Sequence, residues 1–211
     1  MSYAVKELFL TLQGEGVHAG RRAVFLRFAG CNLWSGREQD RATAICRFCD
    51  TDFVGIDGQN GGRYETATAL AARVRSLWGD AKGGRPYTVI TGGEPMLQLD
   101  PALIEALHDE GMEIGVESNG TIVAPAGIDW LCISPKAGST VVQKSGNELK
   151  LVWPQPGCDW QAMEHWDFAH FLVQPMDGSA LPENRRACLD FVLANPRWRL
   201  STQTHKILGI D

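Results

Sequence analysis

The sequence predicts an α/β fold, specifically a partial, open parallel α/β barrel of about six strands. Two observations lead to this fold class. Short apolar runs alternate along the chain with segments of helical periodicity, and polar residues follow the predicted strands. Alternating strands and helices form parallel sheets with right-handed crossovers. Because parallel strands end at the same edge of a sheet, these polar residues should gather into one site.

Apolar runs bounded by turn residues predict the strands. They span residues 23–28, 87–91, 113–117, 130–134, 148–152, 169–174 and 198–202. Ahead of them, an apolar run at 8–12 ends in a turn at 13–16, where two glycines allow close approach of the backbone. Helical periodicity and end signals predict three helices, at 64–79 with Thr66 as N-cap, from Asp100 to Gly111, and at 184–194.

Size and composition favour one globular domain. The chain has 211 residues, of which 44% are hydrophobic and 21% charged, and it contains no internal repeat or linker. We therefore predict a single domain over residues 1–211, with an extended polar loop at 32–45. No apolar run reaches the roughly 20 residues of a membrane span, and no basic start precedes an apolar block, so we expect a cytoplasmic location. A net charge of −5 argues against a large nucleic-acid surface.

Three of the six cysteines, Cys31, Cys46 and Cys49, are separated by fourteen and two residues. In a reducing compartment, such a cluster indicates metal or redox chemistry and not disulfides. Three thiolates suit a 4Fe-4S cluster, because they leave one iron open for an exchangeable ligand. A structural zinc site is the alternative. It needs a fourth ligand, from Cys132, His18 or elsewhere, and the chain lacks zinc-ribbon spacing.

The cysteine pattern resembles that of radical S-adenosylmethionine (SAM) enzymes, although their usual motif has three residues between the first two cysteines. Closing the longer loop costs only about 1 kcal/mol more, which cluster bonding offsets. The segment 92–95, Gly-Gly-Glu-Pro, follows a predicted strand. It is similar to the superfamily's GGE segment, in which exposed backbone and a carboxylate receive the ammonium group of SAM. Glycines there allow main-chain carbonyls to approach the ligand.

Segments across almost the whole chain together resemble the 7-carboxy-7-deazaguanine synthase family of radical SAM enzymes. They are residues 12–16 (LQGEG), 46–51 (CRFCDT), 91–95 (TGGEP), 116–120 (VESNG), 134–136 (SPK) and 174–177 (QPMD). Members of this family convert 6-carboxy-5,6,7,8-tetrahydropterin to 7-carboxy-7-deazaguanine with loss of ammonia, on the route to queuosine. The resemblance implies that activity, a radical SAM fold, a 4Fe-4S cluster, SAM and Mg²⁺.

The resemblance also implies roles for individual residues. Cys31, Cys46 and Cys49 would hold the cluster, and Thr51 would bind Mg²⁺, which prefers hard oxygen ligands. The SAM site would comprise Phe48, Cys49, Asp50, Gly93, Glu94, Ser134, Pro135, Lys136, Gln174, Pro175, Met176 and Asp177. The substrate site would comprise Leu12, Gln13, Gly14, Arg27, Thr91 and Asn119. Within it, the planar fork of Arg27 suits the substrate carboxylate.

Several of these residues have simpler interpretations. Glu15, Glu117 and His205 are candidates for proton transfer, but His205 equally suits an exposed tail. Thr51 and residues 174–177 have the composition of ordinary turns.

Beyond the site, the resemblance implies a homodimer and an electron donor such as a flavodoxin or ferredoxin. Two other functions stay open at this point. One is a different radical SAM activity, such as activation of a glycyl-radical enzyme, which would not predict Arg27 and the turn at 12–16. The other is a zinc or nucleic-acid binding module, against which the acidic balance of the chain counts.

Overall fold

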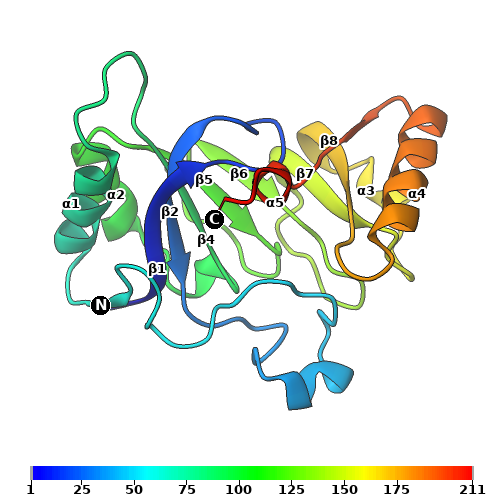
Figure 1. Ribbon diagram of the computed structural model, residues 1–211, viewed down its shortest axis with the longest axis horizontal. Coiled ribbons are helices and arrows are strands. Elements are labelled where there is room, and N and C mark those ends of the chain that lie inside the picture. Colours follow the sequence, from blue (N-terminus) through cyan, green and yellow to red (C-terminus); the bar gives the residue numbers. More distant parts are fainter. Residues whose placement is uncertain (1, 211) are drawn as a thin grey trace.

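A nine-stranded sheet forms the centre of the fold. The computed structural model describes residues 2–210, and its strands follow the order β3-β1-β2-β4-β5-β6-β7-β8-β9 (Figure 1). The strands are β1 (Tyr3–Leu12), β2 (Arg22–Phe28), β3 (Gly62–Tyr64), β4 (Tyr87–Gly92), β5 (Glu113–Ser118), β6 (Trp130–Ile133), β7 (Ser145–Trp153), β8 (Asp167–Pro175) and β9 (Trp198–Leu200). Neighbours from β2 to β9 are parallel, whereas β1 is antiparallel to β2 and β3. The sheet stays open and is mostly parallel, which confirms the predicted open parallel α/β architecture except at the antiparallel edge formed by β1 and β3.

Helices cover one face of the sheet in two groups, with α1 and α2 at one end and α3 and α4 at the other (Figure 1). The helices are α1 (Ala67–Trp78), α2 (Pro101–Asp109), α3 (Trp160–Met163), α4 (Leu181–Ala194) and α5 (Thr204–Leu208), with 3₁₀ helices at Glu38–Thr43 and Pro95–Leu97. Alternation within β2 separates the two faces. Val24 and Leu26 join the hydrophobic core on one face. Phe25 and Arg27, which alternate with them along the strand, line a pocket on the other face.

The sheet is larger than the six or so strands expected, because β1 and β3 add an antiparallel edge. Strand β1 extends well before the apolar run at 8–12, through Lys6 and Glu7, which interrupt the apolar pattern. Both side chains are paired over long sequence distances. Lys6 Nζ lies 2.9 Å from Asp52 Oδ2, and Arg27 Nε donates to Glu7 Oε1 at 2.7 Å. Periodicity carries no signal for such pairs, so the sequence indicates only an apolar run at 8–12 where the structure forms the strand β1.

Three predicted element boundaries also need correction. Tyr64 belongs to β3, so the helix expected at 64–79 begins only at Ala67. Thr66 is its N-cap as predicted, since its side chain accepts a hydrogen bond from Ala69 N at 3.1 Å. Helix α4 begins at Leu181, before the expected start at 184. The last strand stops at Leu200, and the chain then forms α5.

The polar segment 32–45 contains the short 3₁₀ helix Glu38–Thr43 and lies to one side of the sheet, at the bottom of Figure 1. Within residues 2–210, no helix combines the length and apolar character that crossing a bilayer requires.

Candidate active site

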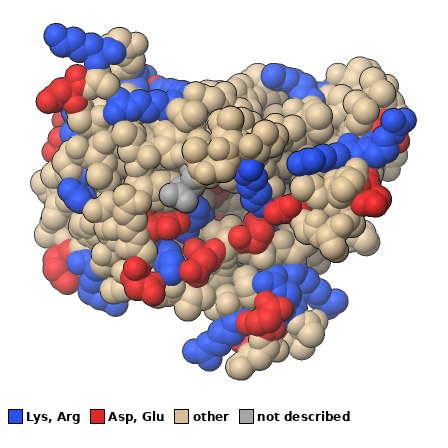
Figure 2. Space-filling model, viewed as in Figure 1, with Lys and Arg blue, Asp and Glu red and all other residues tan. Residues whose placement is uncertain are grey.

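A cavity of about 360 Å³ opens on the sheet face opposite to helices α1, α2, α3 and α4. Figure 2 shows a hollow on this side of the molecule with acidic and basic side chains around its rim. The walls come from the carboxyl ends of β2, β4, β5, β6, β7 and β8, from the turn after β1, and from the C-terminal segment at 203–206. The strand-end residues singled out in the sequence therefore do meet in one place.

Most of the predicted site residues line this cavity. They are Leu12, Gln13, Glu15, Arg27, Cys31, Cys46, Phe48, Cys49, Asp50, Thr51, Thr91, Gly93, Glu117, Asn119, Ser134, Lys136, Gln174, Pro175, Met176, Asp177 and His205. Gly14, Glu94 and Pro135 do not line it. The carbonyl of Gly14 instead accepts a hydrogen bond from Thr204 N at 2.8 Å, and the buried Pro135 carbonyl accepts one from Gln155 Nε2 at 3.3 Å.

Glu94 has a different place from the one expected for a ligand of SAM. Its side chain is 0% exposed, and both carboxylate oxygens are occupied. Oε1 accepts hydrogen bonds from Met96 N and Ser118 Oγ, each at 2.9 Å, and Oε2 accepts one from Asn119 N at 2.8 Å. Glu94 thus joins the exits of β4 and β5 from beneath the cavity. The resemblance to the GGE segment gave no information on the direction of this side chain.

The three clustered cysteines all reach the cavity. The interaction of the neighbouring Cys46 and Cys49 thiols lowers the pKa of Cys49 to about 6 and raises that of Cys46. Among residues 2–210, no three His, Cys, Asp or Glu side chains converge as a single metal ion would need. A 4Fe-4S cluster does not require such convergence, since each thiolate binds a different iron. The donor set therefore fits the cluster better than zinc.

The backbone at Gly93 packs so closely against Cys31 that only glycine fits there. A Cβ atom at this position would overlap the Cβ of Cys31 and the carbonyl oxygen of Gly30. The next hydrogen bond along the chain, from Glu94 N to Gly30 O at 3.0 Å, fixes the same two segments together. The glycine is therefore needed for the approach of β4 to the cysteine, in addition to any approach to a ligand.

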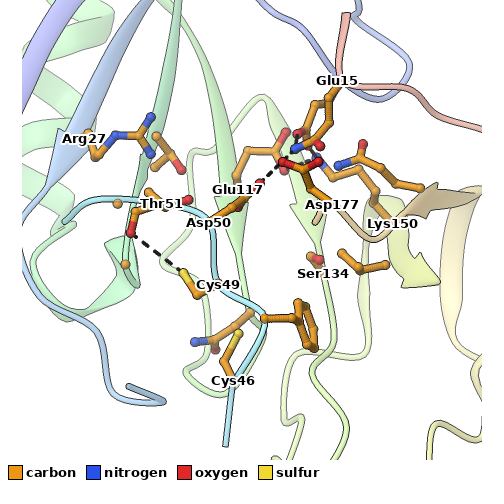
Figure 3. Close-up of a pocket in the computed structure, with 18 of the residues that line it drawn as sticks. Glu15, Arg27, Cys46, Cys49, Asp50, Thr51, Glu117, Ser134, Lys150 and Asp177 are labelled. Carbon is orange, nitrogen blue, oxygen red and sulfur yellow. Dashed lines mark hydrogen bonds and ion pairs between the residues drawn. The ribbon is translucent and has the colours of Figure 1, made fainter. Parts of the chain in front are cut away.

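Arg27 lies on the cavity wall between Glu7 of β1 and Thr91 of β4, with which it is in register. Its ion pair with Glu7 engages Nε, and its two terminal nitrogens make no hydrogen bond to any residue in 2–210. In Figure 3 these nitrogens point into the pocket, on the same side as Thr51. The outer edge of the guanidinium is thus available to an anion.

A buried ionic cluster stands on the other side of the pocket in Figure 3. Lys150 Nζ lies 2.7 Å from both Glu15 Oε2 and Glu117 Oε2, and the lysine side chain is only 4% exposed. Gln13 Nε2 donates to Glu117 at 3.2 Å, and Gln203 Nε2 donates to Glu15 at 3.0 Å. The cluster joins the turn after β1 to β5, β7 and the C-terminal segment.

The two carboxylates of this cluster differ in acidity. Burial opposes ionisation of Glu15, but Lys150 and Gln203 outweigh it and lower the pKa of Glu15 to about 2. At Glu117 burial is the larger effect and, with the neighbouring negative charges, it raises the pKa. The surrounding anions outweigh burial at Lys150 and keep its pKa well above the ordinary value. One member of the pair is therefore ionised, and the other takes up a proton more readily.

The C-terminal segment forms part of the wall and is not an exposed tail. His205 lies in α5 against Gly14, where a Cβ would overlap its ring, and burial lowers its pKa. Lys206 Nζ pairs with Asp50 Oδ2 at 2.5 Å and with Asp177 Oδ2 at 2.6 Å. Lys206 thereby connects the cysteine segment with the exit of β8.

Sequence reasoning missed several polar residues of the cavity. They are Glu7, Lys150, Gln203 and Lys206. A signal for Lys150 was present, because Glu148 and Lys150 alternate with leucines inside a strand, which indicates a polar inner face. No local signal marks Lys206, whose partners Asp50 and Asp177 are distant in sequence.

We expect Lys150→Met to destabilise the chain by about 3 kcal/mol, because two buried carboxylates lose their counter-ion. In the native chain, the low pKa of Glu15 contributes stability above the ordinary value of 4.5, and this is lost as pH falls toward about 2. In the variant both carboxylates should protonate readily, so the deficit should be largest at alkaline pH and shrink on acidification. Urea unfolding across pH measures it, with the exposed Lys82→Met as control. Equal stability of Lys150→Met and the native chain at neutral pH would contradict the expectation.

Comparisons with known proteins agree with this geometry. The radical SAM superfamily model matches residues 39–150. The 7-carboxy-7-deazaguanine synthase of Bradyrhizobium diazoefficiens is 60% identical over 210 residues, and the match covers 100% of both chains. The enzyme of the same name from Caulobacter vibrioides is 59% identical, again over 100% of both chains.

A solved structure agrees as well. The crystal structure of QueE from Escherichia coli matches with a TM-score of 0.71 at 26% identity, covering 97% of this chain and 95% of that one. These matches confirm the resemblance noted in the sequence. The chain belongs to the 7-carboxy-7-deazaguanine synthase family of the radical SAM superfamily.

Proposed function

We propose that this chain converts 6-carboxy-5,6,7,8-tetrahydropterin to 7-carboxy-7-deazaguanine and ammonia. The observation that carries the proposal is one cavity in which three cysteines, an arginine with a free outer edge and a lysine-bridged pair of carboxylates meet. Substrate and product differ by one ammonia, so the reaction is redox-neutral overall. The site must therefore bind a carboxylate, hold a pterin and handle protons.

Membership of the superfamily implies a 4Fe-4S cluster and SAM. We assign the cluster to Cys31, Cys46 and Cys49, whose low-pKa member, Cys49, is already suited to bind as a thiolate. The assigned SAM site is lined by Phe48, Asp50, Gly93, Ser134, Lys136 and residues 174–177. When bound, the cluster and SAM supply the radical chemistry, while the protein orients the reactants and excludes competing reactions.

Lys136 supports the assignment of the SAM site. Its ammonium group contacts the carbonyl and hydroxyl of Ser134, at 2.8 and 2.6 Å. Among residues 2–210, it is a cation of the cavity wall that lies within 4.0 Å of no carboxylate, unlike Arg27, Lys150 and Lys206. A bound anionic group, such as the carboxylate of SAM, would provide the missing charge.

We assign the substrate to the space between Arg27 and the Lys150 cluster. The outer edge of Arg27 would bind the substrate carboxylate, with Thr91 beside it. At the other side, the carboxylate of Glu117, to which Gln13 Nε2 donates at 3.2 Å, would accept hydrogen bonds from the N–H edge of the pterin. Leu12 and Asn119 complete this wall. Gly14 contributes by allowing His205 to pack closely, and not by lining the cavity.

Proton transfer during ammonia loss is assigned to the buried polar groups. Glu117, with its raised pKa, can hold a proton that Glu15, with a pKa of about 2, cannot. His205 has a lowered pKa and is a neutral proton carrier near Glu15. Glu117 and His205 would thus offer a proton donor and a proton acceptor in one region, while the ionised Glu15 stabilises the charge of Lys150 beside them.

We further propose that Thr51 binds Mg²⁺ and that a small electron-transfer protein reduces the cluster. Thr51 lines the cavity beside Asp50 and would offer a hydroxyl to Mg²⁺ together with substrate oxygens and waters. A flavodoxin or ferredoxin would supply the electron. We further propose a homodimer, a single domain over residues 1–211 and a cytoplasmic location.

The test of the function is anaerobic incubation of the reconstituted chain with SAM, a reductant, Mg²⁺ and the tetrahydropterin carboxylate. We expect a product whose mass is lower than that of the substrate by one ammonia. SAM cleavage without that product would instead favour another radical SAM activity. Protein that contains zinc and no iron would instead favour a zinc-binding module.

Arg27→Ala should raise KM for the substrate about tenfold or more, because a charge-assisted contact to the carboxylate is lost. Iron content and SAM binding should stay unchanged. The matched control is Arg85→Ala, since the Arg85 side chain is 65% exposed and remote from the cavity lining. Normal turnover of Arg27→Ala at low substrate concentration would remove Arg27 as the carboxylate anchor.

Thr51→Ala should raise the Mg²⁺ concentration needed for half-maximal activity, because one hard oxygen ligand is removed. Titration of activity with Mg²⁺ measures this, with the exposed Thr202→Ala as the control. An unchanged Mg²⁺ response in Thr51→Ala would exclude Thr51 from the metal site.

A further inference from the structure

The fourteen-residue segment between the first two cysteines is a folded unit. Its two ends meet where the Leu33 carbonyl accepts hydrogen bonds from Ile45 N at 3.2 Å and Cys46 N at 3.4 Å. Between them, Trp34 is 8% exposed and packs edge-on against Phe53, with ring centroids 5.6 Å apart. The segment therefore brings Cys31 and Cys46 to the same side of the cavity despite its length.

Arg41 connects this unit to the turn that carries the other two cysteines. Its Nη1 donates to the carbonyl oxygen of Arg47 at 2.9 Å and to that of Cys49 at 3.1 Å. The guanidinium carbon lies 4.1 Å from the centre of the Trp34 ring, and Nε pairs with Glu38 at 2.7 Å. These contacts hold one face of the guanidinium together with its Nε and Nη1, although the Arg41 side chain is 29% exposed.

The two carbonyls bonded by Arg41 bracket the second half of the Cys46–Cys49 turn. Within residues 2–210 they receive no hydrogen bond from any other donor. Arg41 is therefore the side chain that holds these two carbonyls, while Lys206 holds the following residue, Asp50, from the other side. A guanidinium suits this task, because it is always charged and holds its donors in a planar, rigid arrangement.

We propose that Arg41 is a positioning residue for the cluster-binding turn, which fixes Cys46 and Cys49 and places a positive charge beside the cluster. The proposal rests on the assignment of these cysteines as cluster ligands. A reduced cluster carries one more negative charge than an oxidised one, so a nearby cation favours reduction. Arg41 should thus both retain the cluster and raise its reduction potential.

The test compares Arg41→Met and Arg41→Lys with Arg37→Met in the reconstituted holoenzyme. Arg37 belongs to the same segment, but its side chain makes no hydrogen bond or ion pair with the described turn, so it controls for loss of charge alone. An EPR-monitored redox titration gives the potential, and iron release to a chelator gives cluster retention. Neither measurement needs substrate turnover, so their outcome is separate from that of the proposed function.

Arg41→Met should release iron about tenfold faster than the native chain and should have a more negative potential, because charge-assisted bonds to two carbonyls are lost. Arg41→Lys should recover most of the potential but not the retention, since lysine keeps the charge and loses the planar stacking on Trp34. Arg37→Met should match the native chain in both.

If Arg41→Met takes up no cluster, hydrogen exchange of the cluster-free chain carries the test. Amides at 46–50 should then exchange faster in Arg41→Met and Arg41→Lys than in Arg37→Met. Equal iron release and potential in Arg41→Met and Arg37→Met, or equal exchange in the cluster-free chains, would overturn the proposal.

Discussion

The cavity depends on the ion pairs of Lys150 with Glu15 and Glu117. The ammonium group of Lys150 is buried and lies 2.7 Å from carboxylates of the turn after β1 and of β5. Burial raises the pKa of Glu117, whereas at Glu15 the contacts with Lys150 and Gln203 outweigh burial and lower the pKa, so the two carboxylates are displaced in opposite directions. Lys150 holds Glu15 in the turn after β1. Glu15 in its place accepts a hydrogen bond from Gln203 Nε2 and so fixes the C-terminal segment. Removing this cation would loosen the turn after β1, β5 and the C-terminal segment together.

The other walls of the cavity depend on contacts that hold the strand exits together. The open sheet brings the exits of its parallel strands to one edge, and the buried carboxylate of Glu94 ties two of these exits together by three hydrogen bonds. Gly93 lets β4 approach Cys31 without a side chain in between. Lys206 then joins the cysteine segment to the exit of β8 through its ion pairs with Asp50 and Asp177. Precise placement of the site thus comes from short contacts between segments that are far apart in sequence.

Sequence reasoning reached the fold class and the gathering of strand ends, because short apolar runs, helical periodicity and turn residues are local signals. The family resemblance then named most of the cavity lining. Sequence reasoning failed where structure depends on distant partners. Lys6 and Glu7 obscured the start of β1, since their ion pairs with Asp52 and Arg27 cannot be read from a local pattern. The direction of the Glu94 side chain and the docking of His205 against Gly14 likewise depend on tertiary packing. Family resemblance supplied the chemistry, which periodicity alone does not contain.

We propose centrally that Cys31, Cys46 and Cys49 hold a 4Fe-4S cluster and leave its fourth iron open to SAM. Mössbauer spectroscopy of the chain reconstituted with ⁵⁷Fe, recorded with and without SAM, tests it most directly. The account predicts that SAM changes the spectrum of one iron and leaves the other three nearly unchanged. Identical spectra in the presence of saturating SAM, or a cluster in which all irons respond alike, would contradict it.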